Sequence, residues 1–138
     1  MKLKIKHFFD AAHQLPDTDN LVTKACANLH GHTYAVEVDI IGKDLKGGMV
    51  IDFKAIKNII DELDHTAILT IGNPIIDSII ANNPKQKLVV FDCESTAENI
   101  AKFIHARIMD KYPDLVVTDV RVCEGYKGAE RASWASLG

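Results

Sequence analysis

Residues 30–42 read HGHTYAVEVDIIG, and this stretch is the clearest guide to the fold class. Its alternate residues form two sets, one of which begins with His30 and His32 and continues with apolar or aromatic side chains as far as Ile40. A period of two residues is typical of a β-strand that turns one face to a protein core. We therefore expect a strand over about 30–42, with both histidines at the start of its buried face.

Other segments on either side of this stretch alternate in the same way. Leu3, Ile5 and His7 alternate with lysines, which predicts an N-terminal strand that ends near His13. Residues 116–124 alternate again, and residues 88–91 form a short apolar run, so we expect a strand in each place.

Three helix starts lie between these strands. Asp52 suits the N-cap of a helix to about Leu63, and Asn73 precedes a proline at the first position of a second helix. Residues 95–98, Ser-Thr-Ala-Glu, have the spacing of a capping box, and apolar residues recur at helical spacing from there to Ile108. This order of elements predicts an α+β fold, with helices on one face of an antiparallel sheet.

Length and composition limit the class of protein. A chain of 138 residues, 47% hydrophobic and 25% charged, suits one globular domain over 1–138. The net charge of −3 gives no reason to expect nucleic acid or an anionic membrane as a partner, and no apolar run approaches the roughly 20 residues that span a bilayer. The lysine-rich start does not resemble a signal peptide, and three cysteines, an odd and small number, favour a reducing compartment, so we expect a cytoplasmic protein.

The His-Gly-His sequence is the strongest local signal of chemistry. Residues two apart on a strand point the same way, so His30 and His32 could chelate one ion, and His13 could join them if the first two strands pair. Three histidines with an open position are typical of a catalytic zinc site, although imidazole also suits copper, iron or nickel. The alternative is that all three are ordinary polar or half-buried side chains.

Three further residues near this pattern could carry chemistry. Cys26 could act as a base, as a nucleophile, or as a fourth ligand that closes a structural site of one cysteine and three histidines. Asp64 could orient the imidazole of His65 for acid/base work, or His65 could simply follow a helix C-terminus, where its charge is favourable.

Glu124 emerges from the apolar side of the last strand. A buried lone carboxylate is costly, so this residue needs an arginine or the amino-pyrimidinone edge of a ligand such as a pterin or guanine. Alternatively, the sheet ends there and Glu124 is solvated.

Six short motifs, spread over nearly the whole chain, resemble one family when taken together. They are FDAAH at 9–13, CANLHGH at 26–32, VIDF at 50–53, LDH at 63–65, STAEN at 95–99 and VCE at 122–124. Their order and spacing resemble the 6-pyruvoyltetrahydropterin synthase / 6-carboxytetrahydropterin synthase family. The resemblance implies that His13, His30 and His32 are zinc ligands and that Cys26 is the catalytic thiol, not a ligand.

The same resemblance implies the other site residues and the assembly. Asp64 and His65 would be acid/base partners supplied by a neighbouring subunit, Glu124 would anchor the pterin, and Thr96 would line the same pocket. The family's tunnelling fold implies a four-stranded antiparallel sheet that is completed into a barrel by oligomerisation, as a homohexamer of two stacked trimers.

The family's chemistry is a zinc-dependent lyase reaction on 7,8-dihydroneopterin triphosphate. The compact length and the short Cys-x-x-x-His-Gly-His spacing resemble the branch that forms 6-carboxy-5,6,7,8-tetrahydropterin for queuosine biosynthesis. The alternatives are the 6-pyruvoyltetrahydropterin synthase, which eliminates triphosphate, and a non-catalytic module with a closed zinc site. Candidates for the triphosphate, chosen by charge and position alone, are Lys24, Lys127 and Arg131.

Overall fold

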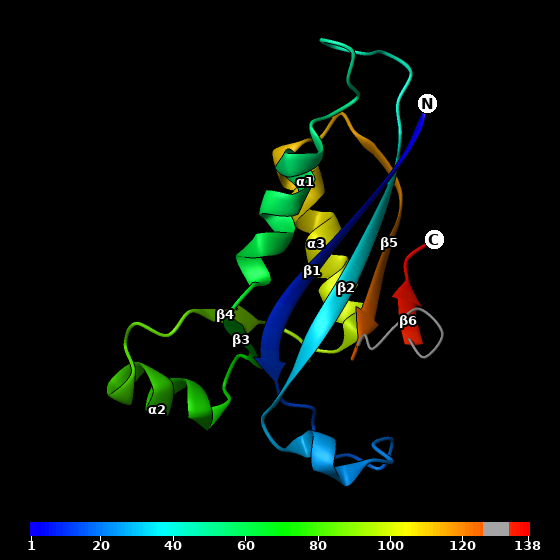
Figure 1. Ribbon diagram of the computed structural model, residues 1–138. Coiled ribbons are helices and arrows are strands. Elements are labelled where there is room, and N and C mark those ends of the chain that lie inside the picture. The colour runs from blue at the N-terminus through cyan, green and yellow to red at the C-terminus, as the bar shows by residue number, and fades with distance from the viewer. Residues whose placement is uncertain (126–132) are drawn as a thin grey trace.

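The computed structural model describes residues 1–125 and 133–138, and its main feature is a strongly curled sheet (Figure 1). Three long strands, β1 (Lys2–His13), β2 (His30–Ile41) and β5 (Val116–Glu124), lie side by side and antiparallel. The short strand β6 (Ser133–Ser136) pairs antiparallel with the end of β5. The three long strands that alternation predicted are therefore confirmed.

The expectation of a four-stranded antiparallel sheet is corrected by two further strands. The full order is β4-β3-β1-β2-β5-β6, in which β3 (Thr66–Thr70) pairs parallel with both β1 and β4 (Leu88–Phe91). β3 has only five residues, four of them buried, so it shows no alternation from which a strand could be recognised. The short β6 depends on its pairing with β5, which is equally invisible in the sequence.

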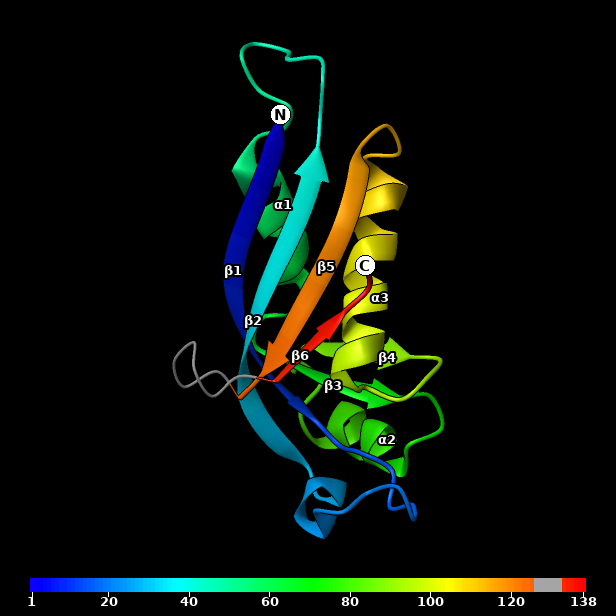
Figure 2. The ribbon, with the colours of Figure 1, turned by 90° about the vertical axis from the view of Figure 1, so that its right-hand side faces the viewer.

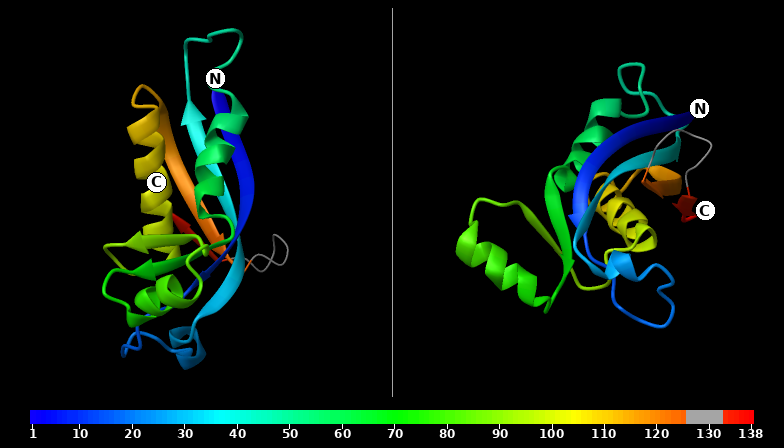
Figure 3. Two further views of the ribbon diagram at one scale, coloured as in Figure 1. Left: turned by 90° about the vertical axis from the view of Figure 1, so that its left-hand side faces the viewer. Right: turned by 60° about the horizontal axis from the view of Figure 1, so that its bottom comes forward.

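Two helices, α1 (Phe53–Ile60) and α3 (Ala97–Lys111), cover one face of the three long strands (Figures 2 and 3). Their apolar residues pack with the inward residues of the strands into one core, which includes Phe9, Tyr34 and Ile104. We call this covered side the inward face of the sheet and the opposite side the outward face. The third helix, α2 (Pro74–Asn82), connects the parallel strands β3 and β4, lies away from the other two and has no buried residue.

The helix starts follow the capping residues with one correction. Asp52 and Asn73 cap α1 and α2 as predicted, each accepting a hydrogen bond from a backbone N–H two residues on. α3 is capped by Thr96, whose hydroxyl accepts from the Asn99 N–H, and not by Ser95 as the capping-box spacing suggested. Ser95 is fully buried, and its carbonyl has a different role in the site described below.

Two short 3-10 helices complete the fold. η1 (Lys24–Ala27) follows the loop after β1, and η2 (Asp61–Leu63) continues α1. None of the helices in residues 1–125 and 133–138 has the length and apolar character of a membrane-spanning segment.

Candidate metal centre

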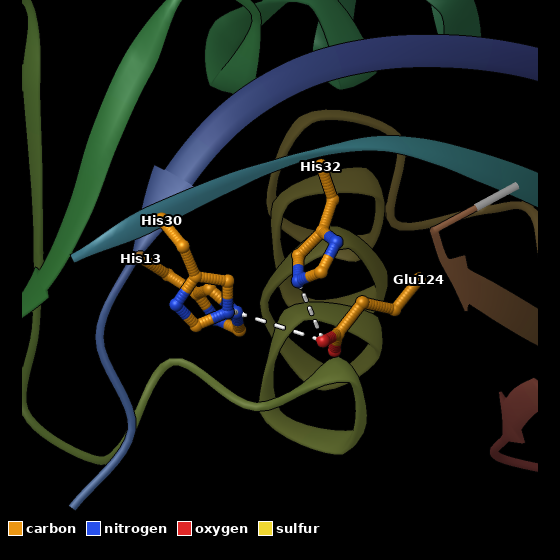
Figure 4. Close-up of side chains that lie close together, drawn as sticks. All are labelled: His13, His30, His32 and Glu124. Atoms are coloured by element: carbon orange, nitrogen blue, oxygen red, sulfur yellow. Dashed lines mark hydrogen bonds and ion pairs between the residues drawn. The ribbon is translucent and has the colours of Figure 1, made fainter. Parts of the chain in front are cut away.

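Three histidines meet where β1 ends and β2 begins. His13 is the last residue of β1 and pairs directly with His30, the first residue of β2, while His32 lies two residues further on. All three belong to the inward set of their strands, and Glu124 reaches the same point from the end of β5 (Figure 4). The strand pairing therefore brings together residues that the sequence separates by more than 100 positions.

The four side chains are close enough to share one ion. Their ligand atoms all lie within 4.8 Å of one another. His13 Nε2 is 3.0 Å from His30 Nε2, and Glu124 Oε1 is 2.8 Å from His32 Nε2 and 3.6 Å from His13 Nε2. Atoms bound tetrahedrally to zinc at its usual bond lengths are about 3.3 Å apart, so these separations fit a metal of that size.

Backbone carbonyls fix two of the imidazoles in one tautomer. His13 Nδ1 lies 2.6 Å from the Ser95 carbonyl oxygen, and His30 Nδ1 lies 2.6 Å from that of Asn28. A carbonyl only accepts hydrogen bonds, so both Nδ1 atoms must donate. In the neutral rings both Nε2 atoms then carry lone pairs that face each other across 3.0 Å, and a cation between them removes the repulsion.

The electrostatics of the group also suit a cation. Burial is the main reason that the pKa of His32 is lowered, which favours the neutral, ligating form. The nearby His13 imidazole contributes most to holding the pKa of Glu124 below its usual value, although burial opposes this. His32 Nε2 is buried and makes no well-formed hydrogen bond within the described part of the chain, even though Glu124 lies 2.8 Å away. A metal ion would satisfy this atom.

The donor set indicates a transition metal but does not single out one. Three imidazole nitrogens and one carboxylate oxygen suit zinc, and imidazole also binds copper, iron and nickel. The group could therefore bind a metal ion, and its donor atoms alone do not decide which one.

Cys26 is close to this group in sequence but is not a member of it. It lies in η1, part-buried, and its backbone carbonyl accepts a hydrogen bond from the Leu15 N–H. The side chain of Gln14 also donates to the Ala27 carbonyl, so the loop is fastened back onto the end of β1. The cluster thus consists of three histidines and a glutamate, without a sulfur ligand among the described residues.

Asp64 and His65 lie outside the group as well. Asp64 Oδ2 is 3.0 Å from His65 Nδ1, and Asp64 Oδ1 accepts a hydrogen bond of 2.9 Å from the Asp10 N–H. The Asp10 hydrogen bond is the main reason that the pKa of Asp64 is lowered. His65 has φ 57°, an uncommon conformation for a residue with a side chain, and its N–H donates to the Asp10 carbonyl. β1 therefore holds the pair in place while the imidazole stays exposed.

The pair lies beside Asp10, an outward residue of β1. Asp10 and Thr33, which hydrogen-bond to each other, alternate with the inward histidines, and together with His65 they border a hollow of about 670 Å³. His65 is therefore outside the metal group, although His32 of that group also lines this hollow.

A second hollow, of about 360 Å³, adjoins the metal group. It is bordered by His32, Glu124, the first turn of α3 and three residues of β6 that include Trp134. Glu124 is thus partly exposed to a space that could admit a ligand, as a ligand anchor requires, yet its carboxylate also contacts the histidines. Thr96 lies at the N-cap of α3, next to Ala97 on the border of this hollow.

Of the candidate phosphate-binding residues, only Lys24 can be placed. Its Nζ donates to the Asp17 carboxylate and to the Thr18 carbonyl. Lys127 and Arg131 lie outside the described residues.

Sequence reasoning did not find the carbonyls of Asn28 and Ser95 that orient the imidazoles. No residue type identifies a backbone carbonyl, so the sequence contained no signal for them. It also missed the contact of Glu124 with the histidines, although its position on an apolar face showed that a partner was needed.

The fold and the site define a class of small α+β proteins in which a curled sheet gathers a metal-binding group of three histidines and a glutamate at one end. Residues 2–133 match the family model described as 6-pyruvoyl tetrahydropterin synthase, so the chain belongs to that family.

Relatives of known name agree with this assignment. The 6-carboxy-5,6,7,8-tetrahydropterin synthase of Haemophilus influenzae is 34% identical over 134 residues, which cover 89% of this chain and 92% of the relative. The protein of the same name from Rickettsia conorii is 38% identical over 109 residues, covering 75% and 76%. Because these relatives are named as synthases, membership of the family supports the prediction that this protein is an enzyme.

Solved structures share the fold. An uncharacterized protein from Wolinella succinogenes has a TM-score of 0.73 at 23% identity, with 99% of this chain and 97% of that one covered. The 6-pyruvoyltetrahydropterin synthase of Plasmodium vivax has a TM-score of 0.63 at 20% identity, with the same coverage. At these identities the likeness concerns the fold alone.

Proposed function

We propose that this protein is a zinc-dependent lyase that converts 7,8-dihydroneopterin triphosphate to 6-carboxy-5,6,7,8-tetrahydropterin, in the route to queuosine. The relatives that carry this name support the choice of branch. The observation that carries the proposal is the pair of Nε2 atoms of His13 and His30, 3.0 Å apart, with both Nδ1 atoms held by carbonyls. With both Nδ1 atoms donating to carbonyls, the two Nε2 lone pairs are oriented to bind one cation.

In the proposed reaction zinc would act as a Lewis acid, and residues of the chain would transfer protons and bind the substrate. Held by His13, His30 and His32, zinc would supply Lewis acidity to the side-chain oxygens of the substrate. The Cys26 thiolate would accept the proton that the substrate's side chain loses. Glu124 would bind the amino-pyrimidinone edge of the pterin, for which the adjoining hollow leaves room, and Thr96 would line the same pocket.

Asp64 and His65 act in a neighbouring subunit's site under this proposal. The imidazole of His65 is exposed, and the pair is not part of the metal group of the same chain. An acid/base pair on one chain can serve a metal on another if copies assemble around the sheet edges. We propose a barrel of this kind, formed as a homohexamer, which would also cover the edge strands β4 and β6.

A product assay tests the proposed reaction. Purified protein is incubated with zinc and 7,8-dihydroneopterin triphosphate, and acetaldehyde and triphosphate are both measured. Release of acetaldehyde supports the carboxy-forming reaction. Release of triphosphate without acetaldehyde would instead identify a 6-pyruvoyltetrahydropterin synthase, and the absence of turnover would favour a non-catalytic metal-binding module.

A further inference from the structure

The position of Glu124 raises a question about the open coordination site that a catalytic metal needs. Its Oε1 atom lies 2.8 Å from His32 Nε2 and 3.6 Å from His13 Nε2, distances comparable with the 3.0 Å between the Nε2 atoms of His13 and His30. Four donors spaced about 3.3 Å apart fill a tetrahedral zinc ion completely. A substrate can then reach the metal only if one donor leaves.

Glu124 is the donor best able to leave. His13 is fully buried and tied to the Ser95 carbonyl, and His30 is tied to the Asn28 carbonyl. His32 lies within the paired part of β2, opposite Ala11. Glu124 pairs with Ser133 of β6, but it is the last residue of β5, and its side chain is 27% exposed beside the 360 Å³ hollow.

We propose that Glu124 is the fourth metal ligand in the substrate-free protein, and that it exchanges the metal for the amino-pyrimidinone edge of the incoming pterin. Glu124 gives up one coordination bond and accepts two N–H hydrogen bonds, and a side-chain oxygen of the substrate takes the vacated position. The exchange needs no electron and no added proton. It rests on the proposed function for the identity of the metal and of the ligand.

The exchange gives Glu124 a role in selectivity. The metal becomes accessible only when a molecule offers two adjacent N–H donors to the carboxylate, so a polyol without a pterin ring would not open the site. Binding of the ring and access to the metal are thereby coupled through one side chain.

The first test is metal affinity without turnover. Zinc binding to wild type, Glu124→Gln and the control Glu98→Gln is measured by competition with a chromophoric chelator, and circular dichroism verifies folding. Glu98 borders the same hollow but is not part of the metal group, so its variant should bind zinc like wild type. Glu124→Gln should bind at least about tenfold more weakly. Equal affinity of this variant and wild type would overturn the proposal.

The second test detects the exchange itself. Apoprotein is loaded with Co²⁺, and 6-methylpterin, which has the amino-pyrimidinone edge but no side-chain hydroxyls, is added while the d–d absorption bands are recorded. The bands should change in wild type and stay constant in Glu124→Gln. Binding is followed separately by quenching of the pterin fluorescence. Failure of 6-methylpterin to bind wild type would contradict recognition of the ring by Glu124, and binding with unchanged bands would show that Glu124 does not leave the metal; either result overturns the proposal.

A His30→Ala variant distinguishes failure of the fourth-ligand proposal from failure of the proposed metal centre. If it loses zinc while Glu124→Gln does not, only the fourth-ligand proposal fails. If His30→Ala binds zinc like wild type, the proposed metal centre itself is wrong, and the role of Glu124 falls with it.

Discussion

The Nδ1 atom of His13 donates to the carbonyl oxygen of Ser95, 82 residues further along the chain, over 2.6 Å. This hydrogen bond joins the end of β1 to the residue before the α3 N-cap. It leaves only the Nε2 atom free to bind an ion, because a carbonyl cannot donate. The fold thereby selects the tautomer that a metal ligand needs.

His30→Ala should remove the bound metal. His30 Nε2 lies 3.0 Å from His13 Nε2, and its loss leaves too few imidazoles to hold zinc tightly. Zinc content after dialysis, measured by mass spectrometry, should fall to near zero, while His105→Ala, which changes a histidine outside the metal group, should retain wild-type content. Unchanged zinc in His30→Ala would refute its assignment as a ligand.

Cys26→Ala should keep the metal and lose turnover. The metal group of the described residues contains no sulfur, so zinc content should stay at the wild-type level. If the thiolate moves the proton, kcat should fall by at least about 100-fold. The matched control is Cys93→Ala, which replaces an exposed cysteine in the segment after β4 and should turn over normally. Retained activity in Cys26→Ala would remove this residue from the mechanism.

Two inactive variants should restore each other if the sites form between subunits. Cys26→Ala and His65→Ala are each expected to be inactive, but co-expression creates sites with an intact Cys26 from one chain and an intact His65 from its neighbour. Random mixing should give about a quarter of the wild-type number of such sites. Turnover of the purified mixture is compared with that of each variant alone. A mixture as inactive as its components would place all catalytic residues within one chain.

Asp119→Ala should loosen the C-terminal segment. The carboxylate of Asp119 accepts hydrogen bonds from the Ser136 hydroxyl, from the N–H groups of Leu137 and Gly138, and from Arg121. Their loss should lower the free energy of unfolding by about 1–3 kcal/mol. Denaturant unfolding followed by fluorescence of Trp134, the single tryptophan of the chain, measures this directly. Asp44→Ala, at an exposed position in the loop after β2, serves as the control.

The difference in unfolding free energy between wild type and Asp119→Ala should depend on pH, because the pKa of Asp119 is lowered in the folded protein. Burial alone would raise the pKa of Asp119, but the hydrogen bonds from Ser136, Gly138 and Arg121 outweigh it, and the net pKa is lowered. A lowered pKa stabilises the folded state above the ordinary value of about 3.9, and this contribution is lost as the pH falls through the folded value. The difference between wild type and Asp119→Ala should therefore be constant from neutral pH to about pH 5 and shrink below about pH 4. A difference that grows on acidification would contradict this account.

Most regular elements could be predicted because their signals are local. The alternation in β2 and the caps Asp52 and Asn73 report on neighbouring residues, so they identify strands and helix starts correctly. β3 was missed because four of its five residues are buried in succession and show no alternation. The prediction of a purely antiparallel sheet was wrong because β3 pairs in parallel with β1 and β4. The predicted N-cap of α3 was wrong by one residue, because serine and threonine both cap helices well and Ser95 and Thr96 are adjacent.

The amino-acid sequence alone specified which residue types are present for chemistry and on which strand face they lie: His30 and His32 together, and Glu124 on an apolar side that requires a partner. The folded chain was needed to show that this partner is the histidine group, and that Asp64 and His65 do not belong to that group. Periodicity fixes the direction of a side chain relative to its own strand only. The distance between atoms on different strands depends on register, pairing and curl, which arise only when the whole chain packs.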